Sequence, residues 1–159
     1  MGSRSNVELA YIAGFLDGDG SLMLQVKKRK DSKIGIRFMS TICFYQDSRH
    51  DKTLYWIQKK FCIGYVSRRK DGMSELRING YRQVSSILKK LTPYIRFKEI
   101  QSKALINACG ILSSMISSKL SKRHLEKLAD LILVIQKENY VTRKKKTRNE
   151  LLTQLGLTP

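Results

Sequence analysis

Two carboxylates, Asp17 and Asp19, end an apolar stretch of a strongly basic chain, and each is followed by glycine in the segment AYIAGFLDGDGS (residues 10–21). The apolar stretch is typical of a helix, and a helix dipole disfavours negative charge at its C-terminal end. A bound divalent cation would remove this conflict, because carboxylate oxygens are ligands that such ions prefer. The residue types and their spacing therefore indicate metal chemistry at a helix end.

Other sites built from acids, glycines or cysteines do not fit. An EF-hand loop that begins at Asp17 would need glycine where Leu22 stands and glutamate where Lys28 stands. A phosphate-binding glycine loop would place the acids beside the phosphate, and no G-K-[ST] follows. Two histidines and three separated cysteines do not make a zinc finger. We expect these cysteines to be small buried side chains in a reducing compartment: Cys43, Cys62 and Cys109.

The composition predicts an anionic partner. Of 159 residues, 31 are Lys or Arg and 13 are Asp or Glu, so the formal charge is +18. Such an excess resists compaction unless an anion is bound, which favours nucleic acid over a ribosomal or membrane-surface role. No apolar run approaches the ~18 residues of a membrane span, and no signal-peptide pattern opens the chain, so we expect an intracellular protein without a membrane partner. We expect a single domain over residues 1–159, with roughly 1–6 a flexible N-terminus or tag and roughly 141–159 a basic tail with a short helix.

Five main helices and a short one are predicted. Ser5 and Glu8 form a capping-box pattern for a first helix that ends near Leu16 or Asp17. Apolar periodicity and capping residues predict the others at residues 53–61, 81–91, 98–112 and 122–140 and after Thr147, which with Glu150 forms a second capping box. With two hairpins between them, these helices predict an α+β fold.

The predicted strands have one apolar and one polar face. Alternation with a period of two predicts strands in SLMLQVK (21–27) and IGIRFMSTICFY (34–45), and Asp71-Gly72 favours the turn of a second hairpin within residues 64–79. The inward positions are Leu22, Leu24, Val26, Ile36, Phe38, Ile42, Phe44, Val66, Leu76 and Ile78. The outward positions include Met39 and Cys43. A ribbon that presents Arg and Gln can read guanine and adenine edges in the major groove. The alternative interpretation is an ordinary sheet face that contacts only solvent. Our candidates for DNA contact on this outer face are Gln25, Lys27, Arg37, Thr41, Tyr65, Ser67, Arg69, Glu75 and Arg77.

Small residues recur along the first helix. Ala10, Gly14 and Gly18 follow every fourth position, and Ala13 lies beside them. Glycine in a helix costs roughly 1 kcal/mol relative to alanine, so a packing reason is expected. A stripe without side-chain bulk allows another backbone to approach closely, although Gly18 also suits the end of the helix.

The segment IAGFLDGDG (residues 12–20) closely resembles the motif of the LAGLIDADG homing endonucleases. The segments SLMLQVK, FYQDS, GYVSRRK and LTPYIRFKEIQSKA resemble single-motif, intron-encoded members over roughly residues 7–150. The resemblance implies an αββαββα fold with C-terminal helices and a saddle-shaped antiparallel sheet that lies in the major groove. It also implies a homodimer in which the two motif helices meet through Ala10, Ala13, Gly14, Asp17 and Gly18.

The same resemblance implies roles for individual residues. Asp19 would be the metal ligand of each subunit, assisted by the Gly18 carbonyl, while Asp17 would be structural. Gln46 matches a position that orders water near the nucleophile, and Lys98 matches a basic residue near the reacting phosphate. His50 stands where relatives often carry arginine. A phosphate-contacting tail would include Lys144, Lys146 and Thr147.

The function implied is Mg²⁺-dependent, site-specific hydrolysis of both strands of a pseudo-palindromic duplex, with Mn²⁺ or Ca²⁺ able to substitute in binding. The products would carry 5′-phosphate and 3′-hydroxyl ends with short 3′ overhangs. The alternatives are an RNA maturase with the host intron RNA as partner, a non-cleaving DNA-binding regulator, and a structural RNA-binding protein. A mobile intron of a chloroplast or mitochondrion is the expected setting.

Overall fold

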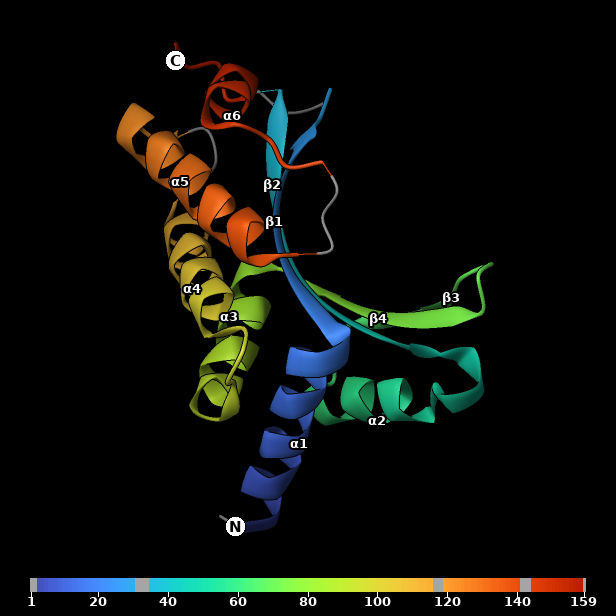
Figure 1. The fold of residues 1–159 in the computed structure, drawn as a ribbon. Helices are drawn as coiled ribbons and strands as arrows, with labels where there is room; N and C mark the ends of the chain where they lie inside the picture. Colours follow the sequence, from blue (N-terminus) through green and yellow to red (C-terminus); the bar gives the residue numbers. More distant parts are fainter. Residues whose placement is uncertain (1–2, 31–34, 116–118, 141–143, 159) are drawn as a thin grey trace.

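The computed structural model describes residues 3–30, 35–115, 119–140 and 144–158. Five long helices and a four-stranded sheet confirm the α+β prediction (Figure 1). The helices are α1 (Ser3–Asp19), α2 (Lys52–Phe61), α3 (Tyr81–Leu91), α4 (Glu99–Ser114), α5 (Lys122–Glu138) and the short α6 (Arg148–Gln154). The strands are β1 (Gly20–Lys28), β2 (Ile36–Asp47), β3 (Tyr65–Arg68) and β4 (Met73–Asn79). Two 3-10 turns, η1 (Ser48–His50) and η2 (Thr92–Tyr94), complete the order.

The sheet is antiparallel with the order β1-β2-β4-β3. The long strand β2 lies in the middle and pairs with β1 over its first part and with β4 over its second part. Figure 1 shows that the β1–β2 end and the β3–β4 end diverge, which leaves a concave face open between them. Helices α3, α4 and α5 lie on the other side, and α2 lies beneath β3 and β4.

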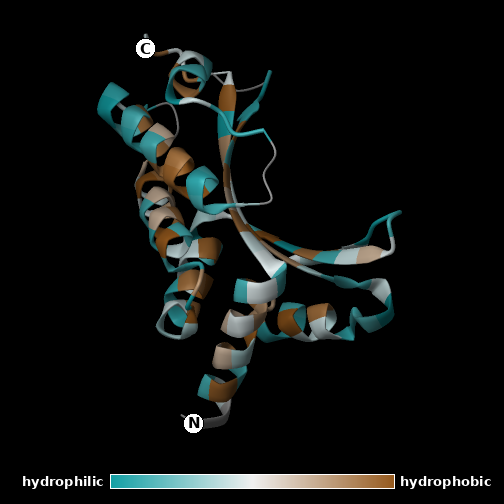
Figure 2. Cartoon of the chain, viewed as in Figure 1, coloured by the Kyte–Doolittle hydropathy of each residue, from teal (hydrophilic) through white to brown (hydrophobic). Residues whose placement is uncertain are grey.

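The core confirms the predicted alternation. Residues paired directly across antiparallel strands share a face, so the register assigns each side chain to one side of the sheet. The predicted inward residues are buried, except that Val66 near the sheet edge is only partly so. Apolar stretches of β1, β2, α4 and α5 are visible in Figure 2 where these elements pack. Cys43 and Cys109 are buried as expected, but Cys62 is exposed at the end of α2, where its backbone is left-handed with φ 53°.

The two capping boxes have different outcomes. The box at Thr147 is confirmed, since the Glu150 amide donates to the Thr147 hydroxyl at 3.2 Å and the Thr147 amide donates to Glu150 at 2.7 Å. The box at Ser5 is wrong as a helix start, because α1 already includes Ser3–Asn6. Glu8 pairs with Lys60 of α2 instead. Helix α1 also continues to Asp19, where β1 follows without a loop.

Some predicted segments lie partly outside the described residues, namely residues 1–2 of the predicted flexible N-terminus or tag, Ile34 of the second strand, and residues 141–143 and 159 of the predicted tail. Both 3-10 turns were missed. Of the helices that the structure describes, none has the length and apolar character to cross a membrane.

Candidate active site

The two acids at the end of α1 have different surroundings. Asp17 is only 8% exposed. Its carboxylate accepts hydrogen bonds from the backbone amides of Arg96 at 2.6 Å, Phe97 at 3.2 Å and Lys98 at 3.0 Å. These amides lead into α4, whose N-terminal dipole favours a negative charge. The conflict between Asp17 and the dipole of α1 is therefore resolved inside the chain, without a cation.

Asp19 is exposed and makes no hydrogen bond or ion pair with another residue that the structure describes. It opens into a hollow of about 540 Å³ where the concave face of the sheet meets the end of α1. The backbone of Gly18 lines the same hollow. The lining residues are Gly18, Asp19, Gly20, Ser21, Met23, Tyr45, Arg69, Asp71, Met73, Lys98, Asn139 and Tyr140. We call this hollow the α1 hollow.

Lys98 is the second predicted catalytic residue that the structure brings into the α1 hollow. Its side chain is buried, and its Nζ donates to the carbonyl oxygen of Asp17 at 2.5 Å. Burial lowers the pKa of Lys98, while the charges of Asp17 and Asp19 oppose this shift. An ammonium group is therefore held beside the open carboxylate of Asp19.

Gln46 is not brought into the α1 hollow. It pairs with Ser74 across β2 and β4, which places it on the face opposite to Tyr45, and its Oε1 accepts from the Asp47 amide at 2.8 Å. Its water-ordering role stays a prediction, as does any role for the exposed His50 in η1.

Sequence reasoning missed several side chains of the α1 hollow, among them those of Ser21, Tyr45, Asn139 and Tyr140. The Tyr45 hydroxyl lies 3.2 Å from the Ser21 hydroxyl, and burial raises the pKa of Tyr45. The alternation of β2 places Tyr45 on the concave face, so its position could have been found. Asn139 and Tyr140, which follow α5, offered no such signal, because only tertiary packing brings them to the end of α1.

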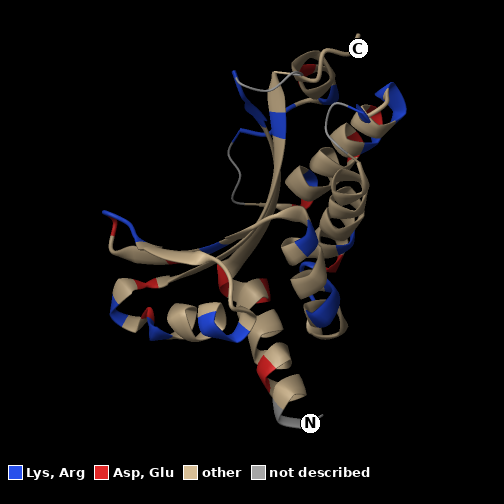
Figure 3. Cartoon of the chain, turned by 180° about the vertical axis from the view of Figure 1, so that it is seen from behind, with Lys and Arg blue, Asp and Glu red and all other residues tan. Residues whose placement is uncertain are grey.

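The concave face carries most of the predicted DNA-contacting residues. Lys27, Arg37 and Arg69 are exposed, and Tyr65 is 52% exposed. Gln25, Ser67 and Arg77 are partly exposed on the same face. Figure 3 shows Lys and Arg at both ends of the sheet.

The structure contradicts the prediction that Thr41 contacts DNA. It is fully buried, because it lies in the central strand between Met23 and Asn79, and its hydroxyl donates to Asn79 Oδ1 at 2.7 Å. This threonine cannot reach a base without breaking that bond. Glu75, another predicted reader, is only 9% exposed and is bonded to Arg77.

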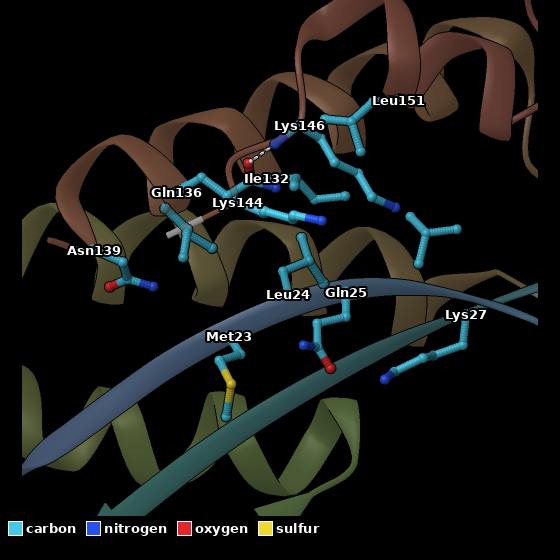
Figure 4. Close-up of a pocket in the computed structure, with 12 residues that line it drawn as sticks. Met23, Leu24, Gln25, Lys27, Ile132, Gln136, Asn139, Lys144, Lys146 and Leu151 are labelled. Carbon is cyan, nitrogen blue, oxygen red and sulfur yellow. Dashed lines mark hydrogen bonds between the residues drawn. The ribbon is translucent and has the colours of Figure 1, made fainter. Parts of the chain in front are cut away.

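The C-terminal tail borders the outer edge of β1. Asn139 Nδ2 donates to the Leu22 carbonyl at 3.1 Å, and Gln154 Nε2 donates to the Val26 carbonyl at 3.1 Å. These bonds fasten the tail to an edge strand that would otherwise leave carbonyls unpaired. Lys144 and Lys146 thereby join Gln25 and Lys27 around a second hollow of about 290 Å³ (Figure 4). The hydroxyl of the predicted phosphate contact Thr147 caps α6.

Comparison with known proteins settles the family. The model of the LAGLIDADG endonuclease family matches residues 12–107, more than half of the chain. The chain belongs to the LAGLIDADG endonucleases. It is 32% identical over 103 residues to the DNA endonuclease I-CvuI of Chlorella vulgaris, a match that covers 65% of the chain and 64% of the relative, less than two thirds of its length. It is 27% identical over 115 residues to the DNA endonuclease I-CreI of Chlamydomonas reinhardtii, which covers 72% of the chain and 70% of the relative.

Solved structures confirm the LAGLIDADG fold. A crystal structure of I-CvuI in complex with the I-CreI target in the presence of Mg aligns with a TM-score of 0.75 and 26% identity, covering 99% of this chain and 100% of that one. The archaeal intron-encoded homing endonuclease I-Vdi141I, complexed with DNA, aligns with a TM-score of 0.81 and 19% identity over 96% of this chain and 97% of that one.

The LAGLIDADG helix α1 leaves one stripe uncovered. Gly14 and Gly18 are exposed, and a Cβ atom at either position would meet nothing within 4 Å. Val7 and Tyr11, which lie on the same stripe, are exposed as well. Ala10 is partly exposed.

Two residues expected in the helix contact lie elsewhere. Ala13 is completely buried in the core of this chain, about 100° around the helix from Gly14. Asp17 is enclosed by the loop before α4. The open surface of the LAGLIDADG helix is therefore narrower than the sequence predicted.

Proposed function

We propose that this chain is a site-specific DNA endonuclease that binds duplex DNA with its concave face and hydrolyses it beside Asp19. The observation that carries the proposal is the difference between the two motif acids. Asp17 is used by the fold, whereas Asp19 is left open in a hollow that also contains Lys98 and Arg69. A non-cleaving regulator would gain nothing from a carboxylate that repels the phosphates, so cleavage is favoured over regulation.

The active enzyme is proposed to be a homodimer. Among the residues that line the α1 hollow, Asp19 is the unpaired carboxylate, since Asp71 is paired with Arg69. The described residues contain no group of three or more acidic, histidine or cysteine side chains that could hold a metal ion. The open stripe at Gly14 and Gly18 allows a second helix backbone to approach closely. A twofold axis along this stripe would bring the Asp19 residues of both subunits together between two concave faces.

The donor set fits a hard divalent cation such as Mg²⁺. The Asp19 carboxylate and the Gly18 carbonyl are oxygen ligands, and Mg²⁺ is usually held by one or two carboxylates together with substrate phosphates. When bound, the ion would polarise the phosphodiester and lower the pKa of the attacking water. Asp19 and Gly18 would hold it, with Mn²⁺ or Ca²⁺ able to take its place in binding.

The remaining chemistry falls to side chains of the α1 hollow. The ammonium group of Lys98 is positioned to attract a phosphate oxygen and stabilise charge that develops on it. The hydroxyl pair of Ser21 and Tyr45 offers hydrogen bonds to the same substrate region. Gln46 would need to change its side-chain conformation to order the attacking water.

The dimensions of the sheet suggest the length of the target. Strand β2 has 12 residues, which at ~3.3 Å each span roughly 40 Å. One turn of B-DNA is about 34–36 Å, or ~10 base pairs. Two subunits would therefore cover a pseudo-palindromic site of roughly 20 base pairs, with cuts near its centre and short 3′ overhangs. Maturase activity and location in an organelle stay predictions.

The test is to incubate the purified protein and Mg²⁺ with DNA of the host gene from which the intron is absent, and to map the DNA ends produced. Paired cuts near the centre of one site, absent with Asp19→Asn, would support the proposal. Tight binding to the site with intact strands would instead indicate a regulator, and the absence of both binding and cuts would reject a DNA target.

A further inference from the structure

The two ends of the concave face differ in how their cations are paired. At the β3–β4 end, Arg77 Nε donates to Glu75 Oε1 at 2.7 Å, and Arg77 Nη2 donates to Oε2 at 3.4 Å. Arg69 Nη1 lies 4.0 Å from Glu75 Oε2, and its Nη2 donates to Asp71 Oδ2 at 2.7 Å. Arg69 and Arg77, two of the three arginines predicted to contact DNA, are therefore held by carboxylates of the same hairpin.

Glu75 lies at the centre of this cluster. It pairs with Tyr45 of β2 on one side and with Ser67 of β3 on the other, so neighbouring residues enclose it on both sides. Its side chain is 11% exposed, against 30% for Arg77 and 47% for Arg69. A buried carboxylate is stable only while it is paired, so turning it toward a base would leave it uncompensated. Glu75 is thus poorly suited to read a base itself.

The β1–β2 end has no such cluster. Lys27 and Arg37 are exposed, and neither forms an ion pair with a carboxylate that the structure describes. Lys144 of the tail lines the same hollow as Lys27, and it too has no acidic partner among the described side chains. Unpaired cations of this kind attract any phosphate, whatever the sequence. The β3–β4 cluster contains two arginines and two acids and is locally neutral.

We propose that Glu75 is a positioning residue for sequence reading, which with Asp71 fixes Arg69 and Arg77 and withholds them from nonspecific phosphate contacts. The proposal rests on the proposed function, in that the concave face binds duplex DNA. The fixed guanidinium groups present their remaining N–H donors toward base edges, where such donors can select guanine. The β3–β4 hairpin then supplies selectivity, and the β1–β2 end with the tail supplies affinity.

The first experiment measures Glu75→Gln against a random-sequence duplex of about 24 base pairs, by fluorescence anisotropy over a range of salt. Releasing one arginine to a phosphate should tighten binding about fivefold at about 0.15 M salt and steepen the log–log salt slope by about 0.9. The matched control is Glu126→Gln, which removes the partner of Lys122 on α5 and should change neither value. Unchanged affinity and slope in Glu75→Gln would overturn the proposal.

The second experiment separates positioning from a plain charge effect. In an Arg69→Ala/Arg77→Ala background, adding Glu75→Gln should no longer change affinity for the random duplex, and a full fivefold gain there would overturn the proposal. Asp71→Asn, at an exposed position, should give a smaller gain in the same direction and keeps the test valid if Glu75→Gln fails to fold.

The third experiment selects bound sequences from a randomised duplex pool. Glu75→Gln should weaken preferences at more than one position of each half-site, whereas a changed preference at one position, with random-duplex affinity unaltered, would show Glu75 to be a reader. If the wild type selects no sequence, the proposed function fails, while the random-duplex measurements still decide whether Glu75 restrains the arginines.

Discussion

The C-terminal end of α1 carries two carboxylates, one hydrogen-bonded inside the fold and the other open to solvent. On the inner side, the Asp17 carboxylate receives three backbone amides from the loop before α4. On the outer side, two residues later, Asp19 opens into the α1 hollow without a hydrogen-bonding partner among the described residues. Two positions along a helix correspond to roughly 200° of rotation, so the acids face different elements.

This difference shows that the two acids of one motif can have separate roles, one in the fold and one open to a ligand. The inner acid attaches α1 to the start of α4 and so places Lys98, whose Nζ reaches back to the Asp17 carbonyl. The outer acid is then free for a ligand. A fold that paired both acids would lack the proposed metal site, and one that paired neither would carry two unpaired charges at a helix end.

Asp19→Asn tests the outer side and should have the largest effect. Losing the charge that holds the cation should lower the cleavage rate about a thousandfold or more, because metal stabilisation contributes several kcal/mol. Binding to the target should stay within a few fold. Single-turnover cleavage and anisotropy measure both, with Asp130→Asn on α5 as the surface control. Equal losses of binding and cleavage would count against Asp19 as a ligand.

Gly14→Leu tests whether the uncovered stripe is the contact between subunits. Nothing in the subunit lies near a Cβ at this position, so the subunit should fold, but the branched side chain would keep the second helix away. We expect dimer dissociation to become at least about a hundredfold easier, the equivalent of about 3 kcal/mol. Sedimentation velocity measures it. Gly110→Leu on α4, where a Cβ also meets open space, is the matched control and should remain dimeric. A wild type that sediments as a monomer would reject the interface.

Lys98→Met tests the residue that binds the Asp17 carbonyl and lines the same hollow as Asp19. We expect cleavage to fall about 100- to 1,000-fold, the range for the loss of one preorganised electrostatic contact. Little stability should be lost, because the backbone amide that binds Asp17 is retained. Lys103→Met, one turn further along α4, should cleave normally. If both variants cleave alike, Lys98 does not act on the phosphate.

The same variant carries a pH prediction. Burial holds the pKa of Lys98 below its unfolded value, so the unfolded chain binds more protons between these two values. The free energy of unfolding of the wild type should therefore rise, relative to Lys98→Met, as pH increases toward the unfolded pKa of about 10.4. Denaturant unfolding of both proteins at several alkaline pH values measures the difference. A constant difference would mean that burial of Lys98 has no such cost.

Asp17→Asn tests the inner side. The amide can still accept from one or two of the three backbone N–H groups, so we expect a loss of about 2 kcal/mol. For a domain of this size the melting temperature should fall by about 4–8 °C. Calorimetry measures it, and cleavage at low temperature should fall far less than in Asp19→Asn. Wild-type stability combined with lost cleavage would reverse the assignment of the two acids.

Much of the fold could be predicted from local patterns. The period-two alternation of β1 and β2 identified the apolar residues that face the helices, although the outward positions Thr41 and Cys43 are buried as well. The helix starts show the limit: Thr147 and Glu150 form a capping box, whereas Glu8 binds Lys60, a residue 52 positions away. A local sequence pattern does not show that a residue such as Lys60, distant in the sequence, will bind the side chain of Glu8.

The site was predictable in its motif and less so in its surroundings. The sequence identified Asp19 and Lys98, which the structure brings to the same hollow. It did not distinguish buried from exposed outward positions, because Thr41 lies in a central strand whose neighbours cover it. It also did not reveal that Glu75 and Arg77 bind each other, since that depends on their side-chain conformations.

The most direct test of the division between Asp17 and Asp19 is the Ca²⁺ dependence of DNA binding, which reports metal ligation without cleavage. Affinity for the target duplex is measured with Ca²⁺ and with EDTA for the wild type, Asp17→Asn and Asp19→Asn. We predict that Ca²⁺ tightens binding by the wild type and by folded Asp17→Asn but leaves Asp19→Asn unchanged. Full Ca²⁺ dependence in Asp19→Asn, or its loss in Asp17→Asn alone, would contradict the account.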